Sequence, residues 1–172
     1  MSMDYGCIFC VAGRERNVVT FLEKESIQAI SPVKHRYRRH DGVKDLEKVT
    51  LFPGYVFFAV DPELMDLDFL RIRTHSDVLR ILYSGDEKRW QLSGTDRDFV
   101  KELFSFGAEI GFSKGYYIEK TIHFTQGFLQ NHEKDIVAVN HRAQTAQIKI
   151  RIGEIAFTLW LGFELTDRTG ES

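Results

Sequence analysis

The stretch that decides the fold is Leu51-Phe52-Pro53-Gly54-Tyr55-Val56-Phe57-Phe58. Proline has no backbone N–H to donate to a β-ladder, so Pro53 indicates a strand edge or a bulge. Large aromatic side chains at such a place can form an exposed apolar patch for a partner. They can equally be the buried core of a strand. The residues alone leave both interpretations open.

Around this stretch, the first hundred residues alternate predicted strands and helices. Strands are predicted over residues 5–12, 27–33, 49–60 and 78–83. Helices are predicted over 14–26, from Asp61-Pro62 onward, and after a cap at Thr95. The polar segment 34–48 is predicted to be a hairpin, because Asp41-Gly42 is a typical turn pair. This order predicts an α+β fold in which helices pack on one antiparallel sheet.

After Phe106 the pattern changes to period two. Apolar residues alternate with polar ones over 146–152 and 155–165, and Gly153-Glu154 between them predicts a type II′ turn. Several short strands predict a small closed β-barrel, because closure removes exposed sheet edges. The chain is therefore predicted to have two domains and two connecting or terminal segments: 1–107, a linker at 108–115, the barrel at 116–166, and a polar tail at 167–172.

Composition and motifs exclude several classes of protein. The chain has 172 residues, of which 43% are hydrophobic, and a net charge of -2, which suits small domains with real cores. No apolar run is long enough for a bilayer and the N-terminus lacks a signal pattern, so we expect a cytoplasmic protein without a membrane partner. No catalytic or phosphate-loop motif is present, and we expect neither an enzyme nor a cofactor.

The two cysteines, Cys7 and Cys10, have C-x-x-C spacing, which is compatible with redox chemistry or half of a zinc site. A second ligand pair is missing for zinc. On the apolar strand predicted here, residues three apart point to opposite faces. Buried core cysteines and no metal site are therefore the favoured interpretation, with a redox enzyme as the alternative.

The densest positive run, residues 34–40, predicts contact with nucleic acid. Its candidate residues are Lys34, His35, Arg36, Arg38 and Arg39. Cationic side chains on an extended hairpin can reach phosphates, and Tyr37 can stack on a base. The alternative is a solvated hairpin. A second candidate surface is the start of the first helix, where Arg14 and Arg16 lie beside free backbone N–H groups.

Three stretches together resemble the NusG family of transcription factors. Residues 51–58 resemble the F-P-x-Y-[VLI]-F strand of the family's N-terminal (NGN) domain. Residues 5–15 resemble its opening strand, which ends in Gly13-Arg14-Glu15, and residues 127–150 resemble the family's KOW barrel. The barrel motif looks closest to the specialised antiterminator paralogues of the LoaP or RfaH kind.

The resemblance implies an NGN-type antiparallel α/β sandwich followed by an SH3-like KOW barrel. It implies that the first domain binds the clamp helices of RNA polymerase through a patch of Phe52, Pro53 and Tyr55, and thereby suppresses pausing or termination. An RNA hairpin or non-template DNA would recruit such a factor through the first helix and the segment before the fourth strand, which carries Arg71, Arg73 and Arg80.

The family default is a monomer, and the barrel of some members binds a ribosomal protein. The alternative function is a ribosome-associated or general RNA-binding KOW protein.

Overall fold

The computed structural model describes residues 2–64, 69–83 and 89–166. Its contacts divide the chain into two compact units: unit 1 is Met1–Pro32 with Thr50–Ala108, and unit 2 is Val33–Val49 with Glu109–Ser172. The sequence predicted a contiguous first domain ending at residue 107. The structure differs at segment 33–49, which folds with the C-terminal residues. The tail expected at 167–172 lies outside the described residues.

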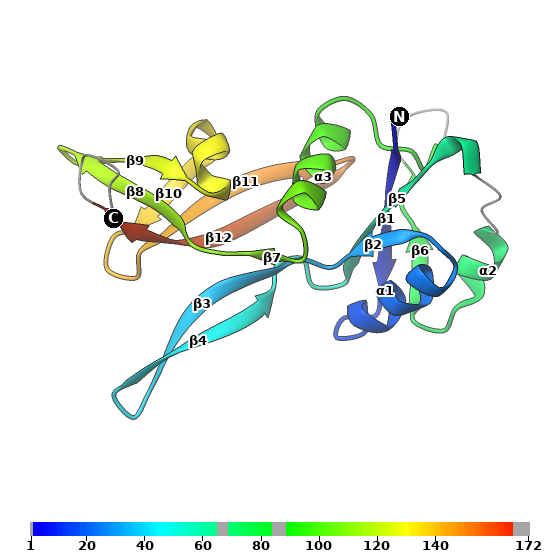
Figure 1. Ribbon diagram of the computed structural model, residues 1–172, viewed down its shortest axis with the longest axis horizontal. Coiled ribbons are helices and arrows are strands. Elements are labelled where there is room, and N and C mark those ends of the chain that lie inside the picture. The colour runs from blue at the N-terminus through cyan, green and yellow to red at the C-terminus, as the bar shows by residue number, and fades with distance from the viewer. Residues whose placement is uncertain (1, 65–68, 84–88, 167–172) are drawn as a thin grey trace. The chain divides into compact units, whose positions relative to one another are not determined.

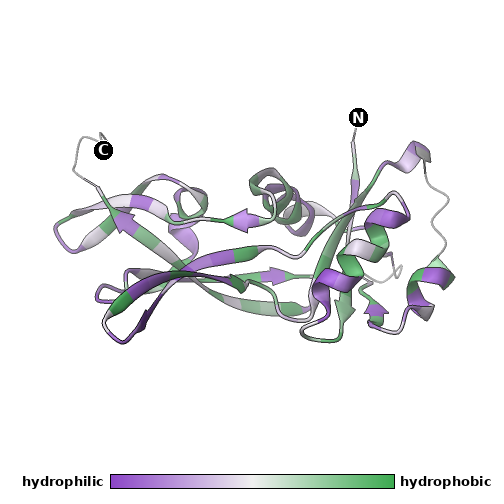
Figure 2. Ribbon diagram, turned by 60° about the horizontal axis from the view of Figure 1, so that its bottom comes forward, coloured by the Kyte–Doolittle hydropathy of each residue, from purple (hydrophilic) through white to green (hydrophobic). Residues whose placement is uncertain are grey.

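Unit 1 is built on a four-stranded antiparallel sheet in the order β2-β5-β1-β6. Its strands are β1 (Asp4–Cys10), β2 (Gln28–Ile30), β5 (Tyr55–Val60) and β6 (Val78–Ile81). Its helices are α1 (Glu15–Lys24), the 3-10 turn η1 (Pro62–Leu64), α2 (Phe69–Thr74) and α3 (Gly94–Phe106) (Figure 1). The predicted sheet with packed helices is confirmed. The helices carry both hydrophobic and hydrophilic residues (Figure 2), as amphipathic helices on a sheet do.

Alternation along the strands gives the sheet two buried faces. On one face, Ile8 and Phe58 pack with Leu22 of α1 and Ile72 of α2. On the other, the buried residues of α3 are Phe99, Val100 and Leu103, and Phe99 contacts Phe52. Cys7 and Phe57 share this second face because they are odd-numbered on paired strands.

Two predicted helix starts had different outcomes. At Asp61-Pro62 the expected start is confirmed, because Asp61 Oδ1 accepts a 2.9 Å hydrogen bond from the N–H of Glu63. Residues 65–68, between η1 and α2, lie outside the described residues. The cap expected at Thr95 was wrong: α3 begins earlier, at Gly94, and its N-cap residue Ser93 makes no side-chain capping bond. Gly94 has a φ of 58°, which lets the chain turn into the helix one residue sooner.

Unit 2 contains a five-stranded sheet in the order β10-β11-β12-β8-β9. Its strands are β8 (Ser113–Ile118), β9 (Thr121–Gln126), β10 (Ile136–Asn140), β11 (Thr145–Ile152) and β12 (Ile155–Leu165). The β12–β8 pair is parallel. The core includes Phe124, Phe163, Ile148 and Leu159. The 3-10 segment η2 (Phe128–Asp135) was not predicted, and it places Phe128 and Leu129 in the same core.

A hairpin completes unit 2. Strand β3 (Val33–His40) lies between β4 (Val43–Thr50) and the short β7 (Glu109–Ile110). Its Asp41-Gly42 turn is confirmed, because both residues have positive φ, 49° and 79°, as a type I′ turn requires. At the β11–β12 turn, Ile152 pairs with Ile155, and Gly153 has a φ of 61°, in agreement with the predicted type II′ turn. In the described part of the chain, none of the helices has the length and apolar character needed to cross a bilayer.

Candidate functional site

Residues 52–55 form a tight turn that leads into the first residue of β5. The N–H of Tyr55 donates to the carbonyl of Phe52 at 3.0 Å. Pro53 and Gly54 are the two central residues, and Gly54 has a φ of 85°. Proline followed by a glycine of positive φ is the requirement of a type II turn. The strand edge or bulge predicted at Pro53 is therefore a type II turn, with Pro53 exposed at its tip.

Two other elements of unit 1 hold this turn in place. Glu15, the first residue of α1, is buried, and its carboxylate accepts hydrogen bonds from the N–H groups of Gly54 at 2.7 Å and Gly13 at 3.1 Å. The carbonyl of Gly54 accepts a 2.8 Å bond from the N–H of Cys10 in β1. The Gly13-Arg14-Glu15 motif therefore fixes the backbone of the turn.

An aromatic row lies beside the turn on the sheet. Phe9 of β1 pairs with Tyr55 on one side and with Arg80 of β6 on the other. The Phe9 and Tyr55 rings are 5.3 Å apart, and the Arg80 guanidinium lies 5.5 Å from the centroid of Phe9. Both rings are half-buried. The row and Pro53 make a partly apolar surface with one cation at its edge, which we call the turn surface.

Phe52 does not belong to that surface. Only 1% of it is exposed, and its ring packs edge-on against Phe57 at 5.1 Å and Phe99 at 6.3 Å. The expectation of direct partner contact through Phe52 is thus corrected. Its side chain is buried between the sheet and α3, where it packs under the turn. Of the three expected residues, Pro53 and Tyr55 are accessible.

The five arginines predicted to contact nucleic acid in unit 1 do not form one cluster. Arg14 and Arg16 are exposed at the N-terminal end of α1. Arg71 pairs at 3.0 Å with Glu25, at the opposite end of that helix, which is about 15 Å long. Arg73 lies over the ring of Tyr83. Arg80 lies over Phe9, as part of the turn surface.

The basic run of unit 2 lies along β3, where its side chains make different contacts. Arg36 pairs with Glu47 at 2.7 Å, and His35 lies 3.1 Å from Glu109. The carboxylate of Glu109 also accepts a hydrogen bond from Lys48. The hydrogen bonds from Lys48 and His35 lower the pKa of Glu109. Burial, with the Arg36 charge second, lowers the pKa of Lys34, whose ammonium donates to the carbonyl of Trp160. Arg38 and Arg39 are exposed.

Tyr37 is engaged within unit 2. Phe112 stacks on its ring with centroids 4.7 Å apart, and the ammonium of Lys44 lies 3.9 Å from its centroid. Its hydroxyl donates to Glu164, and this bond raises the pKa of Tyr37. The expectation that Tyr37 is free to stack on a base is therefore corrected: the ring anchors the hairpin.

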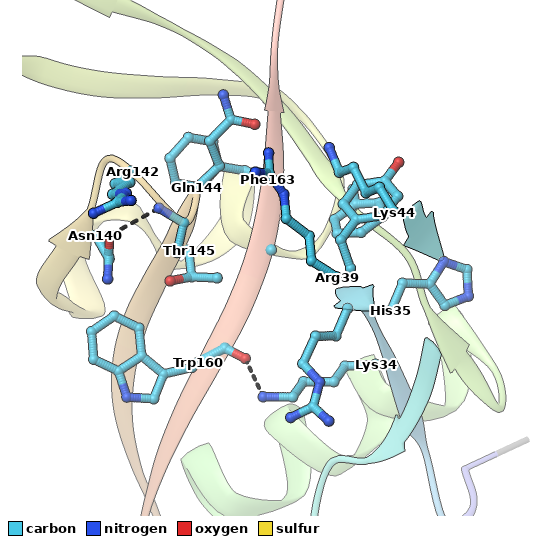
Figure 3. Close-up of a pocket in the computed structure, with 15 residues that line it drawn as sticks. Lys34, His35, Arg39, Lys44, Asn140, Arg142, Gln144, Thr145, Trp160 and Phe163 are labelled. Atoms are coloured by element: carbon cyan, nitrogen blue, oxygen red, sulfur yellow. Dashed lines mark hydrogen bonds between the residues drawn. The ribbon is translucent and has the colours of Figure 1, made fainter. Parts of the chain in front are cut away.

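A groove of about 750 Å³ lies within unit 2, between the hairpin and strand β12 (Figure 3). Lys34, His35, Arg36 and Arg39 line it, so the structure brings four of the five predicted hairpin residues together. It adds three residues that the sequence did not single out: Lys44, Arg142 and Trp160. Nothing in their local sequence separates them from other exposed residues, because it is the long-range packing of β3 against β12 that brings them together. Phe9 was missed for the same reason, since strand pairing places it beside Tyr55.

The two cysteines are core residues. Both are free and buried. Burial, followed by the charges of Glu15 and Asp77, raises the pKa of Cys10 to about 11, and burial raises that of Cys7 further. A neutral buried thiol is a poor nucleophile, which disfavours the redox alternative. Within residues 2–64, 69–83 and 89–166, no three His, Cys, Asp or Glu side chains come together as metal ligands.

Comparison with known proteins agrees with this architecture. A family model described as "NusG: Transcription termination factor nusG" matches residues 3–99. The solved structure titled "Domain interaction in Thermotoga maritima NusG" matches with a TM-score of 0.52 and 18% identity, over 94% of each chain. Among curated proteins, none matches the sequence.

Proposed function

Because the chain belongs to the NusG family, whose members are non-enzymatic transcription factors that bind RNA polymerase, we propose that it binds the polymerase clamp helices through the turn surface. In this proposal it acts during elongation and suppresses pausing or termination. It works as a monomer in the cytoplasm.

The observation that supports the polymerase contact is the construction of the turn surface. Tyr55 and Phe9 offer apolar rings, Pro53 is exposed beside them, and Arg80 adds a positive charge. Partly buried aromatic side chains with an adjacent arginine are typical of residues that dominate binding energy at interfaces. The backbone is fixed by Glu15, so binding needs little ordering of the turn.

The test is equilibrium binding of the full chain to purified core RNA polymerase. We expect Tyr55→Ala combined with Arg80→Glu to weaken binding by at least about tenfold, the scale of an interface hot spot. The control is Leu70→Ala, which removes a highly exposed apolar side chain from α2, on the other face of the sheet. Equal binding by both variants, with folding intact, would remove the turn surface from the proposal.

We further propose that the protein is a specialised antiterminator recruited to particular operons by an RNA hairpin or by non-template DNA. The exposed Arg14 and Arg16 and the basic β3 strand support a nucleic-acid contact. Single-round transcription across a terminator tests it: read-through should rise only on templates that carry the recruiting element. Equal read-through on every template would indicate a general elongation factor.

The alternative of a ribosome-associated or general RNA-binding KOW protein rests on unit 2, whose basic groove suits RNA. Under the antiterminator proposal, contact between this unit and a ribosomal protein is an additional activity. Affinity capture of the protein from cells distinguishes the two functions. Recovery of polymerase without ribosomes supports the elongation factor, whereas recovery of ribosomes without polymerase supports the alternative.

A further inference from the structure

We propose that the groove between the β3–β4 hairpin and β12 in unit 2 binds single-stranded nucleic acid. This deepens the nucleic-acid part of the proposed function and is independent of the polymerase contact in unit 1. It assigns binding roles to Lys44, Arg142 and Trp160.

The groove has a floor and two walls. Trp160 and Gly162 of β12 lie on its floor, where Gly162 pairs with Thr145 of β11. The hairpin and Phe112 make one wall, and the turn between β10 and β11, with Asn140 and Arg142, makes the other. Figure 3 shows Arg142 and Trp160 on one side of β12, and Lys34 and Arg39 on the other. A volume of about 750 Å³ is within the range of specific ligand pockets.

Gly162 allows close packing beside the groove, because it has no side chain. A Cβ atom at Gly162 would lie 2.5 Å from the ring of Phe112. Phe112 in turn stacks on Tyr37 of the hairpin. The glycine thus lets the hairpin wall approach β12 closely.

The charges of the groove favour an anion. Among the described residues, five Lys or Arg side chains line it and no carboxylate does: Lys34, Arg36, Arg39, Lys44 and Arg142. Lys34 and Arg36 already bond to the Trp160 carbonyl and to Glu47. The other three make no ion pair with any described residue.

The register of the hairpin places two of these positive charges next to each other. A two-residue turn at Asp41-Gly42 sets Arg39 directly opposite Lys44. Like charges directly opposite on a sheet destabilise it. A phosphate between Arg39 and Lys44 would offset their repulsion.

Trp160 distinguishes a nucleic acid from a simple anion. Its side chain is 37% exposed on the groove floor. A positively charged groove with an exposed aromatic ring is the usual design for binding single strands, because phosphates follow the cations and a base stacks on the ring. Paired bases in a duplex keep their faces covered by stacking, so single-stranded nucleic acid fits this site better.

The first test removes charge from the groove. Binding of the full chain to a fluorescent 12-nucleotide single strand is measured by anisotropy over a range of salt concentrations, with RNA and DNA of one sequence. The groove variant is Arg39→Gln with Lys44→Gln and Arg142→Gln. The matched control, Lys120→Gln with Lys149→Gln and Arg151→Gln, removes the same charge from exposed residues of unit 2 that do not line the groove.

We expect the groove variant to bind at least about tenfold more weakly, with a salt slope reduced by about 2, since each phosphate contact contributes about 0.7 for single strands. The control should bind like the wild type. The strand that binds more tightly, RNA or DNA, identifies the natural ligand. The proposal would be overturned if the groove variant and the control lost affinity equally, or if the wild type bound neither RNA nor DNA.

The second test uses the aromatic ring. Binding should quench the fluorescence of Trp160, because Trp90 is buried in the core of unit 1. Trp160→Leu should remove the quenching and weaken binding about 5- to 150-fold, the range for loss of one stacked base. Binding of the matched duplex as tightly as the single strand would contradict the stacking role.

Both variants should retain polymerase binding, so failure of this proposal is distinguishable from failure of the turn surface.

Discussion

The carboxylate of Glu15 accepts a hydrogen bond from the backbone N–H of Gly54, with 2.7 Å between the nitrogen and Oε1. The two residues are 39 positions apart. Glu15 is only 6% exposed, and the same oxygen also accepts from the N–H of Gly13. One buried carboxylate therefore ties the start of α1 to the turn that presents Pro53 and Tyr55. The geometry of the turn surface depends on this side chain.

Glu15→Ala should lower the free energy of unfolding by about 1.5–3 kcal/mol, the range for a hydrogen bond to a charged group. The substitution leaves the buried N–H of Gly54 without its acceptor. Glu15→Gln should lose less, because its amide oxygen can still accept. Urea denaturation measures both.

The control for Glu15 is Arg16→Ala, an exposed neighbour on α1 that should change stability by less than about 0.5 kcal/mol. A Glu15→Ala protein as stable as the wild type would show that the two hydrogen bonds contribute nothing to folding.

Gly6→Ala should destabilise unit 1 through a direct clash. The ring of Phe58 lies over Gly6, so an added Cβ atom would overlap it. Phe58 is fully buried and stacks on Trp90 at 5.3 Å, which leaves it little room to move. We expect a loss of about 1–3 kcal/mol.

A double-mutant cycle with Phe58→Leu tests the cause, because the smaller side chain makes room for the methyl group. The two substitutions together should cost less than the sum of their separate losses. Additive losses would place the cause elsewhere.

The cysteines should be inert in the folded protein. With a pKa raised from about 9 to about 11, only about one Cys10 thiol in a thousand is ionised at pH 8. Alkylation at pH 8 should therefore be much slower in buffer than in urea. Rapid stoichiometric labelling of native protein would revive the redox alternative.

The same thiols should make stability fall at high pH. The folded state keeps their protons while the unfolded chain loses them above pH 9, so the folded state binds more protons. Between pH 9 and 11 the free energy of unfolding should fall by up to about 1.4 kcal/mol per pH unit for each thiol. Replacing both cysteines with alanine should remove this contribution, as denaturation across that pH range would reveal.

Gly162→Ala should loosen the hairpin within unit 2. The methyl group would displace Phe112, which stacks on Tyr37. Hydrogen exchange should then rise over residues 33–49. Thr158→Ala, an exposed change on the same strand, should leave their exchange unaltered. Unchanged exchange in both variants would mean that Phe112 is not what holds the hairpin.

Local chemistry explains what the sequence predicted well. The Asp41-Gly42 turn follows from two neighbouring residues that tolerate positive φ. The alternation over 155–165 marks β12 because a strand has a period of two. The turn at Pro53-Gly54 is also a local property, since proline and glycine suit the two central positions of a type II turn.

Long-range packing explains most of what was missed. The burial of Phe52 depends on Phe99, a helix residue 47 positions later, and no local pattern indicates that contact. The 3-10 segment over 128–135 was missed because period two was expected throughout the C-terminal residues, although its buried Phe128, Leu129 and His132 have helical spacing. The Ser113 hydroxyl, which accepts from the N–H of Leu129 at 3.0 Å, holds its first turn. Likewise, Trp160 lies beside the basic hairpin only because β3 packs on β12.

The grouping of residues 33–49 with the C-terminal strands has a consequence for synthesis on the ribosome. Val33 pairs with Glu109, and Tyr37 bonds to Glu164, 127 positions later. Strands β3 and β4 emerge early but lack their partners until almost the whole chain has been made. Unit 1 has all of its strands by Ile81 and its last helix by Phe106, so it can fold first and leave the hairpin as an undocked loop. When the emerged part of a nascent chain ends before residue 109, it would therefore display a folded unit 1 with its turn surface, while strands β3 and β4 still lack β7 and β12.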